Sequence, residues 1–131
     1  MRVTTKGLYA IEVLCFLASQ KLGKSVSISE IEEKTSIPYD YAEKILLRLK
    51  RAGMVESRRG NAGGYIATAH ADALTLADIF KAVGEEIAPW PKMPRQKKNR
   101  PLICPIHPVW QKLYREIDGF FRKTTLKDFL R

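Results

Sequence analysis

A basic turn between two β-prone stretches constrains the fold of this chain more than any other feature. Residues 55–66 read Val-Glu-Ser-Arg-Arg-Gly-Asn-Ala-Gly-Gly-Tyr-Ile, so two arginines and three glycines lie near the centre. The pattern predicts a β-hairpin, because glycine supplies the positive φ angles of tight turns and lets the backbone approach another surface closely. The tip would carry positive charge and little bulk. An ordinary hairpin with a solvated basic turn fits the same residues.

Apolar residues at helical spacing predict three helices before the hairpin. The first follows the possible caps Thr4 and Thr5 and reaches about residue 20, and the second follows Ser27 and reaches about residue 34. The third covers residues 39–52 and ends before Gly53, a residue typical of the position after a helix. This order predicts a helix–turn–helix with its recognition helix at 39–52 and a wing at 56–65.

Beyond the wing, the composition predicts a helix, a basic loop and a long final helix. The helix is expected over residues 74–83, and six of the seven prolines then lie between residues 89 and 108, together with five lysines and arginines. The final helix is expected from Pro108 to about Lys123. We therefore expect a winged helix-turn-helix DNA-binding domain over residues 1–84, a proline- and lysine-rich loop over 85–107, to which the resemblance described below assigns the sensor role, and a dimerisation helix with a C-terminal turn over 108–131. The expected fold class is mainly α with a small β-hairpin wing.

The final helix has a heavy apolar stripe for a terminal element. Its members are Trp110, Leu113, Tyr114, Ile117, Phe120 and Phe121. The stripe could pack back on its own domain or against a second copy of the chain. We favour the second, because large apolar stripes are rarely left in water and a two-fold dimer presents two recognition helices to one DNA site.

The charge balance favours an anionic partner. Lysines and arginines number 23 against 14 aspartates and glutamates, a net charge of +9, which favours nucleic acid or, less often, a membrane surface. The longest apolar run, residues 13–18, is too short to span a bilayer, and the first residues lack a signal-peptide layout. Two widely separated cysteines predict no disulfide framework and a cytoplasmic location. We expect no enzyme, since no nucleophile–base pair or paired carboxylates stand out.

Several passages carry a family resemblance. They are Met1–Ala10 (MRVTTKGLYA), residues 36–53, Arg58–Tyr65 (RRGNAGGY), Leu74–Gly84 (LTLADIFKAVG), residues 104–110 and the closing Thr125-Leu126. With them, essentially the whole chain resembles the Rrf-two family of bacterial transcription regulators, which includes the iron–sulfur cluster regulator, the nitric-oxide-sensing repressor and the cysteine-metabolism repressor. The resemblance implies a homodimeric DNA-binding repressor or activator whose long C-terminal helices cross to form the dimer interface.

The predicted DNA contacts come from the first helix, the recognition helix and the wing. They are Thr4, Thr5, Lys6, Tyr39, Tyr41, Glu43, Lys44, Arg48, Arg58, Arg59 and Gly60. The resemblance puts Tyr41, Glu43 and Lys44 in the recognition helix, and it puts Arg59 in the wing. Free N–H groups at the start of the first helix would suit a phosphate.

Each of these contacts has an ordinary alternative. Glu43 can accept a hydrogen bond from a cytosine amino group, or it can complete a capping box with Asp40. Tyr39 and Tyr41 can reach phosphates through their hydroxyls, or one of them can pack against the wing. Basic side chains of the recognition helix can contact phosphate or lie in solvent. Arg59 is nearer the tip than the other wing arginine and is the better candidate for a narrow, A·T-rich minor groove.

The loop before the final helix leaves the sensing chemistry open. Relatives with an iron–sulfur cluster usually have three cysteines there, whereas this chain has only Cys104, with Lys92 and Lys98 roughly where the others would be. A conventional three-cysteine site is therefore not expected. Some relatives complete their cluster with an acidic or histidine ligand from the first helix of the partner subunit. The resemblance therefore implies that Cys104 and His107 could hold a cluster or a single metal ion with Glu12 of the partner subunit as a third ligand. Equally, the basic loop could make Cys104 a redox-active thiolate, or Cys104 could be an inert thiol and His107 a helix cap.

Other modes of sensing also fit the sequence. A small effector could bind near Trp90 and Trp110, although no spacing supports a particular ligand. The chain could also be a winged-helix protein-interaction module that senses through a partner enzyme. Cys15, within an apolar helix, is expected to be inert core.

Overall fold

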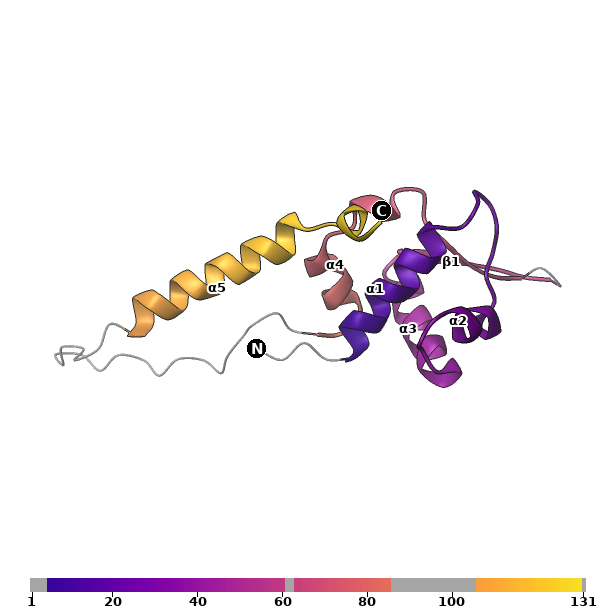
Figure 1. Ribbon diagram of the computed structural model, residues 1–131, viewed down its shortest axis with the longest axis horizontal. Coiled ribbons are helices and arrows are strands. Elements are labelled where there is room, and N and C mark those ends of the chain that lie inside the picture. The colour runs from indigo at the N-terminus through magenta and orange to yellow at the C-terminus, as the bar shows by residue number, and fades with distance from the viewer. Residues whose placement is uncertain (1–4, 61–62, 86–105, 131) are drawn as a thin grey trace.

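A computed structural model gives the arrangement of the helices and the hairpin (Figure 1). It describes residues 5–60, 63–85 and 106–130, the last range without the side chains of residues 106 and 107. The elements are α1 (Thr5–Ala18), α2 (Ile28–Lys34), α3 (Tyr39–Arg51), β1 (Val55–Arg58), β2 (Gly64–Ala67), the one-turn helix η1 (Ala71–Ala73), α4 (Leu76–Ala82), α5 (Ile106–Lys123) and the one-turn helix η2 (Leu126–Phe129). The fold is mainly α with a small β-hairpin, as predicted.

The first three helices pack around one apolar core. The buried side chains of α3 lie on one face at helical spacing, and they are Ala42, Ile45, Leu46 and Leu49. Those of α1 are Ala10, Val13, Leu14 and Leu17. The side chain of Ser27 accepts a hydrogen bond from the Glu30 N–H at 3.1 Å and so begins α2, as predicted from their spacing. α1 ends at Ala18, slightly before its predicted limit.

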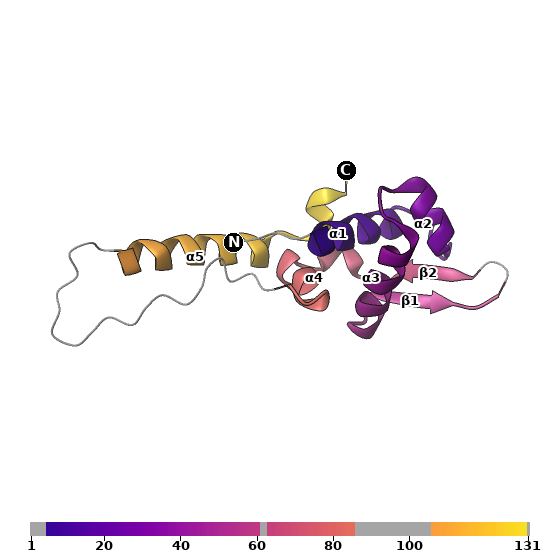
Figure 2. The same ribbon diagram turned by 90° about the horizontal axis from the view of Figure 1, so that it is seen from below.

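The wing is held to the helices by a short third segment of extended chain. Strand β1 pairs with β2 in antiparallel register, with Ser57 opposite Tyr65. On the other edge of β2, the N–H of Val26 donates to the carbonyl of Tyr65 at 2.9 Å, and the N–H of Tyr65 donates to the carbonyl of Val26 at 2.8 Å. Gly64 allows this approach, because a Cβ atom there would overlap the carbonyl of Val26. The wing therefore extends from the end of the molecule opposite α5 (Figure 2).

The closing residues of the chain complete the core that the first residues begin. The N–H of Leu126 donates to the carbonyl of Leu74 at 2.8 Å, and the N–H of Leu76 donates to the carbonyl of Thr124 at 2.9 Å. The side chain of Leu126 is fully buried in the core formed by α1, α2 and α3. Residues 124–130 thus pack with the winged helix, whereas the division at residue 108 groups them with the final helix. Nothing local in the sequence specifies this long-range pairing.

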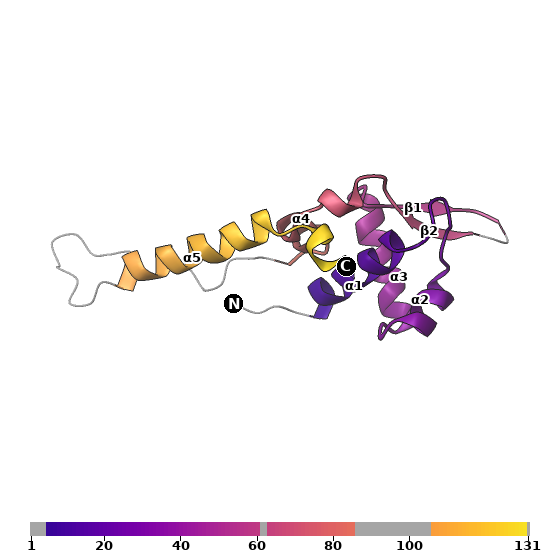
Figure 3. The ribbon, with the colours of Figure 1, turned by 45° about the horizontal axis from the view of Figure 1, so that its top comes forward.

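α5 begins at Ile106, two residues before the predicted start at Pro108. A proline fits the first turn of a helix, where its missing N–H would have no helical partner in any case. His107 is therefore part of the helix and not a residue that caps it from outside. The N-terminal half of α5 extends away from the other helices (Figure 3). None of the helices in the described ranges has the length and apolar character of a membrane span.

The apolar stripe of α5 divides into two faces. Phe121 is 8% exposed and packs edge-on against Phe80 of α4, with 5.1 Å between ring centroids, and Ile117 packs in the same cluster. Phe121 and the half-buried Ile117 thus pack on their own α4, while their predicted place in a dimer interface stays a prediction. Phe120 is 61% exposed and Val109 is 62% exposed. Residues 109, 113 and 120 form the outward face, at helical spacing.

Candidate nucleic-acid interface

The recognition helix α3 exposes one continuous face. The side chains on it are Asp40, Glu43, Lys44, Leu47 and Arg51, which recur at three- and four-residue spacing, and Tyr39 is exposed beside them. Opposite this face, α3 packs into the core. Leu47, 47% exposed among charged neighbours, was not among the predicted contacts. The sequence does hold a signal for Leu47, because it is an apolar residue that lies off the buried stripe of α3, one turn beyond Glu43.

Glu43 is available for contacts outside the protein. The N-cap of α3 is Pro38, and no side chain caps this helix end. Asp40 therefore lies inside the helix, not at its N-cap. The alternative in which Asp40 and Glu43 form a capping box is wrong, because the chain enters α3 through the fixed φ of a proline.

Tyr41 and Arg48 point back to the protein. The ring of Tyr41 is half-buried and packs edge-on against Tyr9 of α1, with 5.2 Å between centroids. The Nη1 of Arg48 donates a hydrogen bond to the carbonyl of Val83 at 2.8 Å. Tyr39, by contrast, remains exposed.

The wing brings two arginines to its end. Arg58 and Arg59 are exposed, and the N–H of Gly63 donates to the carbonyl of Gly60 at 2.8 Å where the chain turns. Gly60 has a φ of +107°, a conformation that favours glycine. A shallow groove runs between this turn and the segment before α2, and it is lined by Gly23, Lys24, Ser25, Ser27, Glu30, Arg58, Arg59 and Gly63. Lys24 forms an ion pair with Glu30 at 3.5 Å. The remaining positive charge of the groove therefore comes from Arg58 and Arg59.

The start of α1 is partly occupied by a carboxylate. Thr5 is exposed and Lys6 is half-buried, while Thr4 lies outside the described residues. The N–H of Gly7 donates to Oε1 of Glu85 at 3.1 Å. One of the amide groups that could bind phosphate is therefore already paired within the protein.

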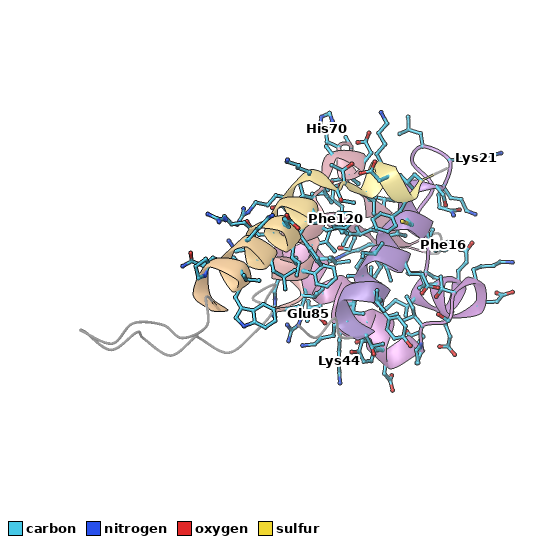
Figure 4. All side chains as sticks on the ribbon, turned by 60° about the vertical axis from the view of Figure 1, so that its left-hand side comes forward. Phe16, Lys21, Lys44, His70, Glu85 and Phe120 are labelled. Atoms are coloured by element: carbon cyan, nitrogen blue, oxygen red, sulfur yellow. The ribbon has the colours of Figure 1, made fainter. Side chains whose placement is uncertain are left out.

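Lysines lie on different sides of the molecule. Figure 4 shows Lys44 on the lower edge, beyond α1, and Lys21 on the upper edge near the end of α1. Both side chains are exposed. They therefore form a matched pair for testing which surface meets an anionic partner.

Comparison with known proteins decides the family. Residues 3–131 match the model of the Rrf2 family, described as an iron-dependent transcriptional regulator. The chain belongs to the Rrf2 family. It is 30% identical over its full length to the transcriptional regulator IscR of Photobacterium profundum, of which the match covers 76%. This Rrf2-family chain is thus a DNA-binding transcriptional regulator and not an enzyme.

Solved structures of Rrf2-family regulators share the fold. CymR, the global cysteine regulator of Bacillus subtilis, is 25% identical with a TM-score of 0.83, over 98% of this chain and 95% of CymR. IscR of T. potens is 26% identical with a TM-score of 0.74, over 98% of this chain and 85% of that one.

The residues that would form the iron site implied by the family description lie only partly in the described ranges. No group of three His, Cys, Asp or Glu side chains lies together in these parts of the chain. Both oxygens of the Glu12 carboxylate accept hydrogen bonds from Ser36, and the Ser36 N–H lies 3.2 Å from Oε1. Glu12 thus anchors the turn between α2 and α3 in its own subunit. The side chains of Cys104 and His107, the other predicted ligands, lie outside the described residues.

Proposed function

We propose that the chain binds a specific double-stranded DNA site as a homodimer and represses transcription by occupying that site. The observation that carries the proposal is the exposed face of α3, since its buried opposite face leaves polar and charged groups free to enter a major groove. A major groove presents a distinct pattern of donors and acceptors for each base pair.

Adjacent residues of α3 supply complementary chemistry for reading bases. Glu43 would accept a hydrogen bond from a cytosine amino group, and Lys44 would donate to guanine O6 or N7 or to a phosphate. Leu47, one turn further, would contact the methyl group of thymine. Apolar and polar contacts on one face would together define a short sequence.

The wing would contact the minor groove beside the recognition helix. Arg59 follows directly after β1, next to the glycine turn, where the backbone has little bulk. Arginine is favoured in narrow, A·T-rich minor grooves, in which the negative potential is concentrated. Thr5 and Lys6 at the start of α1 would contact phosphate through side chains.

The outward face of α5 supports dimerisation. Val109 and Phe120 are largely exposed, with Leu113 between them on the same face. A two-fold axis along this face would bury the apolar groups of both copies. It would also present two recognition helices to half-sites about one helical turn apart, roughly 34 Å.

A matched pair of lysine variants tests the proposal. The DNA is selected from a random double-stranded pool with the wild-type protein, and affinity for the selected sequence is measured by fluorescence anisotropy. Lys44→Ala should weaken binding by about tenfold or more, whereas Lys21→Ala, with the same loss of charge on another surface, should stay within about threefold. Failure of the pool to enrich any sequence, or equal effects of the two variants, would contradict specific binding through α3. It would favour the alternative of a protein-interaction module.

A further inference from the structure

A three-residue junction at the end of α4 is hydrogen-bonded to both of the helices that flank it. On one side, the carbonyl of Val83 accepts the bond from Arg48 of α3 at 2.8 Å. On the other side, Oε1 of Glu85 accepts the bond from the N–H of Gly7 in the first turn of α1 at 3.1 Å. Gly84 lies between them with a φ of +76°. The recognition helix and the first turn of α1 thus meet at residues 83–85.

Close packing fixes both of these contacts. A Cβ atom on Gly7 would overlap the ring of Phe80 and lie 2.7 Å from Oε2 of Glu85. A Cβ atom on Gly84 would lie 2.7 Å from Nη1 of Arg48. Each hydrogen bond therefore depends on a glycine that leaves room for the partner side chain.

The carboxylate of Glu85 is only half satisfied. Its Oε2 atom is buried and has no hydrogen-bond partner among the residues that the structure describes. A buried oxygen without a partner opposes folding, so packing stability alone does not account for a glutamate here. Figure 4 shows Glu85 against the first turn of α1.

We propose that Arg48 and Glu85 are positioning residues for DNA binding, which together set α3 and the first turn of α1 in their places. The proposal rests on the proposed function, because it assumes that both elements meet DNA. It also reassigns Arg48 from a phosphate contact to a bond within the protein. A displacement of Glu85 would act on α1 directly, through its bond to Gly7, and on α3 through Val83.

The first test compares two variants of Glu85. Glu85→Ala and Glu85→Gln remove the same charge, but glutamine keeps an oxygen that can accept the Gly7 N–H. On DNA selected with the wild-type protein, Glu85→Ala should bind about fivefold to tenfold more weakly than Glu85→Gln. Hydrogen exchange, measured without DNA, should be faster in the first turn of α1 in Glu85→Ala only. Equal affinity and equal exchange in the two variants would overturn the role of Glu85.

The second test separates positioning from phosphate contact at Arg48. Arg48→Met should weaken binding while leaving the slope of log affinity against log salt unchanged. Loss of a phosphate contact would instead reduce that slope by about 0.9. The double variant Arg48→Met with Glu85→Ala should show less than the product of the single losses, because both bonds serve one junction. A changed slope or independent effects would overturn the proposal, and a wild-type protein that enriches no DNA would instead refute the proposed function.

Discussion

Gly7 of α1 lies close against Phe80 of α4. Its missing side chain makes room for the ring of Phe80, whereas Gly119, within α5, has no atom within 4 Å of the position that a Cβ would occupy. The two glycines therefore have opposite roles, although both lie inside helices. Gly7 allows a tight contact, and Gly119 only adds backbone freedom to the unfolded chain.

We expect alanine to have opposite effects at these two positions. Gly7→Ala should lower the free energy of unfolding by about 1–3 kcal/mol through overpacking. Gly119→Ala should raise it by about 0.5–1 kcal/mol, because alanine favours helix over glycine. Urea unfolding at one fixed protein concentration measures both. A Gly7→Ala protein as stable as the wild type would mean that α1 and α4 are packed less closely than described.

Cys15 illustrates how burial controls the chemistry of a side chain. Burial, and then the negative charge of Glu12, raise the pKa of the Cys15 thiol above its ordinary value. A raised thiol pKa lowers the thiolate fraction at neutral pH, and the thiolate is the reactive form.

We therefore expect Cys15 to react slowly with iodoacetamide at pH 7 and to gain reactivity only at higher pH than an ordinary thiol. Peptide mass spectrometry would compare the folded chain with the urea-unfolded chain over a range of pH. Glu12→Gln should increase the rate of Cys15 alkylation slightly, because it removes the negative charge that is the smaller of the two causes of the raised pKa. A rate at pH 7 that is equal in folded and unfolded protein would contradict the prediction.

At the scale of elements, α5 serves two purposes at once. Its C-terminal end packs on α4 through Phe121 and Ile117, while Val109 and Phe120 face outward. Two adjacent phenylalanines thus lie in different environments, because neighbours in a helix are separated by about 100°.

Alanine substitutions of these two phenylalanines should therefore separate folding from assembly. Phe121→Ala should lower the free energy of unfolding by about 3–5 kcal/mol, since it empties a buried site. Phe120→Ala should change the stability of the single chain by less than about 0.5 kcal/mol but shift a dimer toward monomer. Analytical ultracentrifugation at several concentrations measures the second effect. A Phe120→Ala protein that associates as strongly as wild type would move the proposed interface off this face of α5.

For the molecule as a whole, charge and shape act together. The chain has a net charge of +9. The molecule is elongated, with the wing at one end and α5 at the other (Figure 2). An anionic duplex would meet α3 and the wing arginines on the winged-helix part. Affinity should then depend strongly on salt.

We expect the affinity for selected DNA to fall by about 10³-fold or more between 50 and 200 mM salt if at least six phosphates are contacted.

Arg59→Ala should weaken specific binding without changing the circular dichroism spectrum, because the wing arginines are exposed. Arg58→Ala is the matched control, and we expect the smaller effect there. Equal affinities for all three proteins would remove the wing from the mechanism.

The sequence by itself determined the elements and the family. Periodicity and caps predicted α2, α3 and the hairpin closely, since Ser27, Gly53 and the wing glycines act through local backbone geometry. The residue passages of the wing and helices indicated the regulator family, which the comparison confirms. The predicted DNA contacts of Glu43, Lys44 and Arg59 stay predictions.

Only the tertiary structure decided which side chains already have a contact partner within the same chain. Arg48, Glu12 and Phe121 each find a partner from a distant segment, namely Val83, Ser36 and Phe80 respectively. The pairing of Leu126 with Leu74 joins residues more than fifty positions apart in the same way. Local propensity describes neighbours along the chain, whereas these contacts depend on how the elements pack in space. A charged or aromatic residue therefore has the same local pattern whether it faces solvent, a partner or its own core.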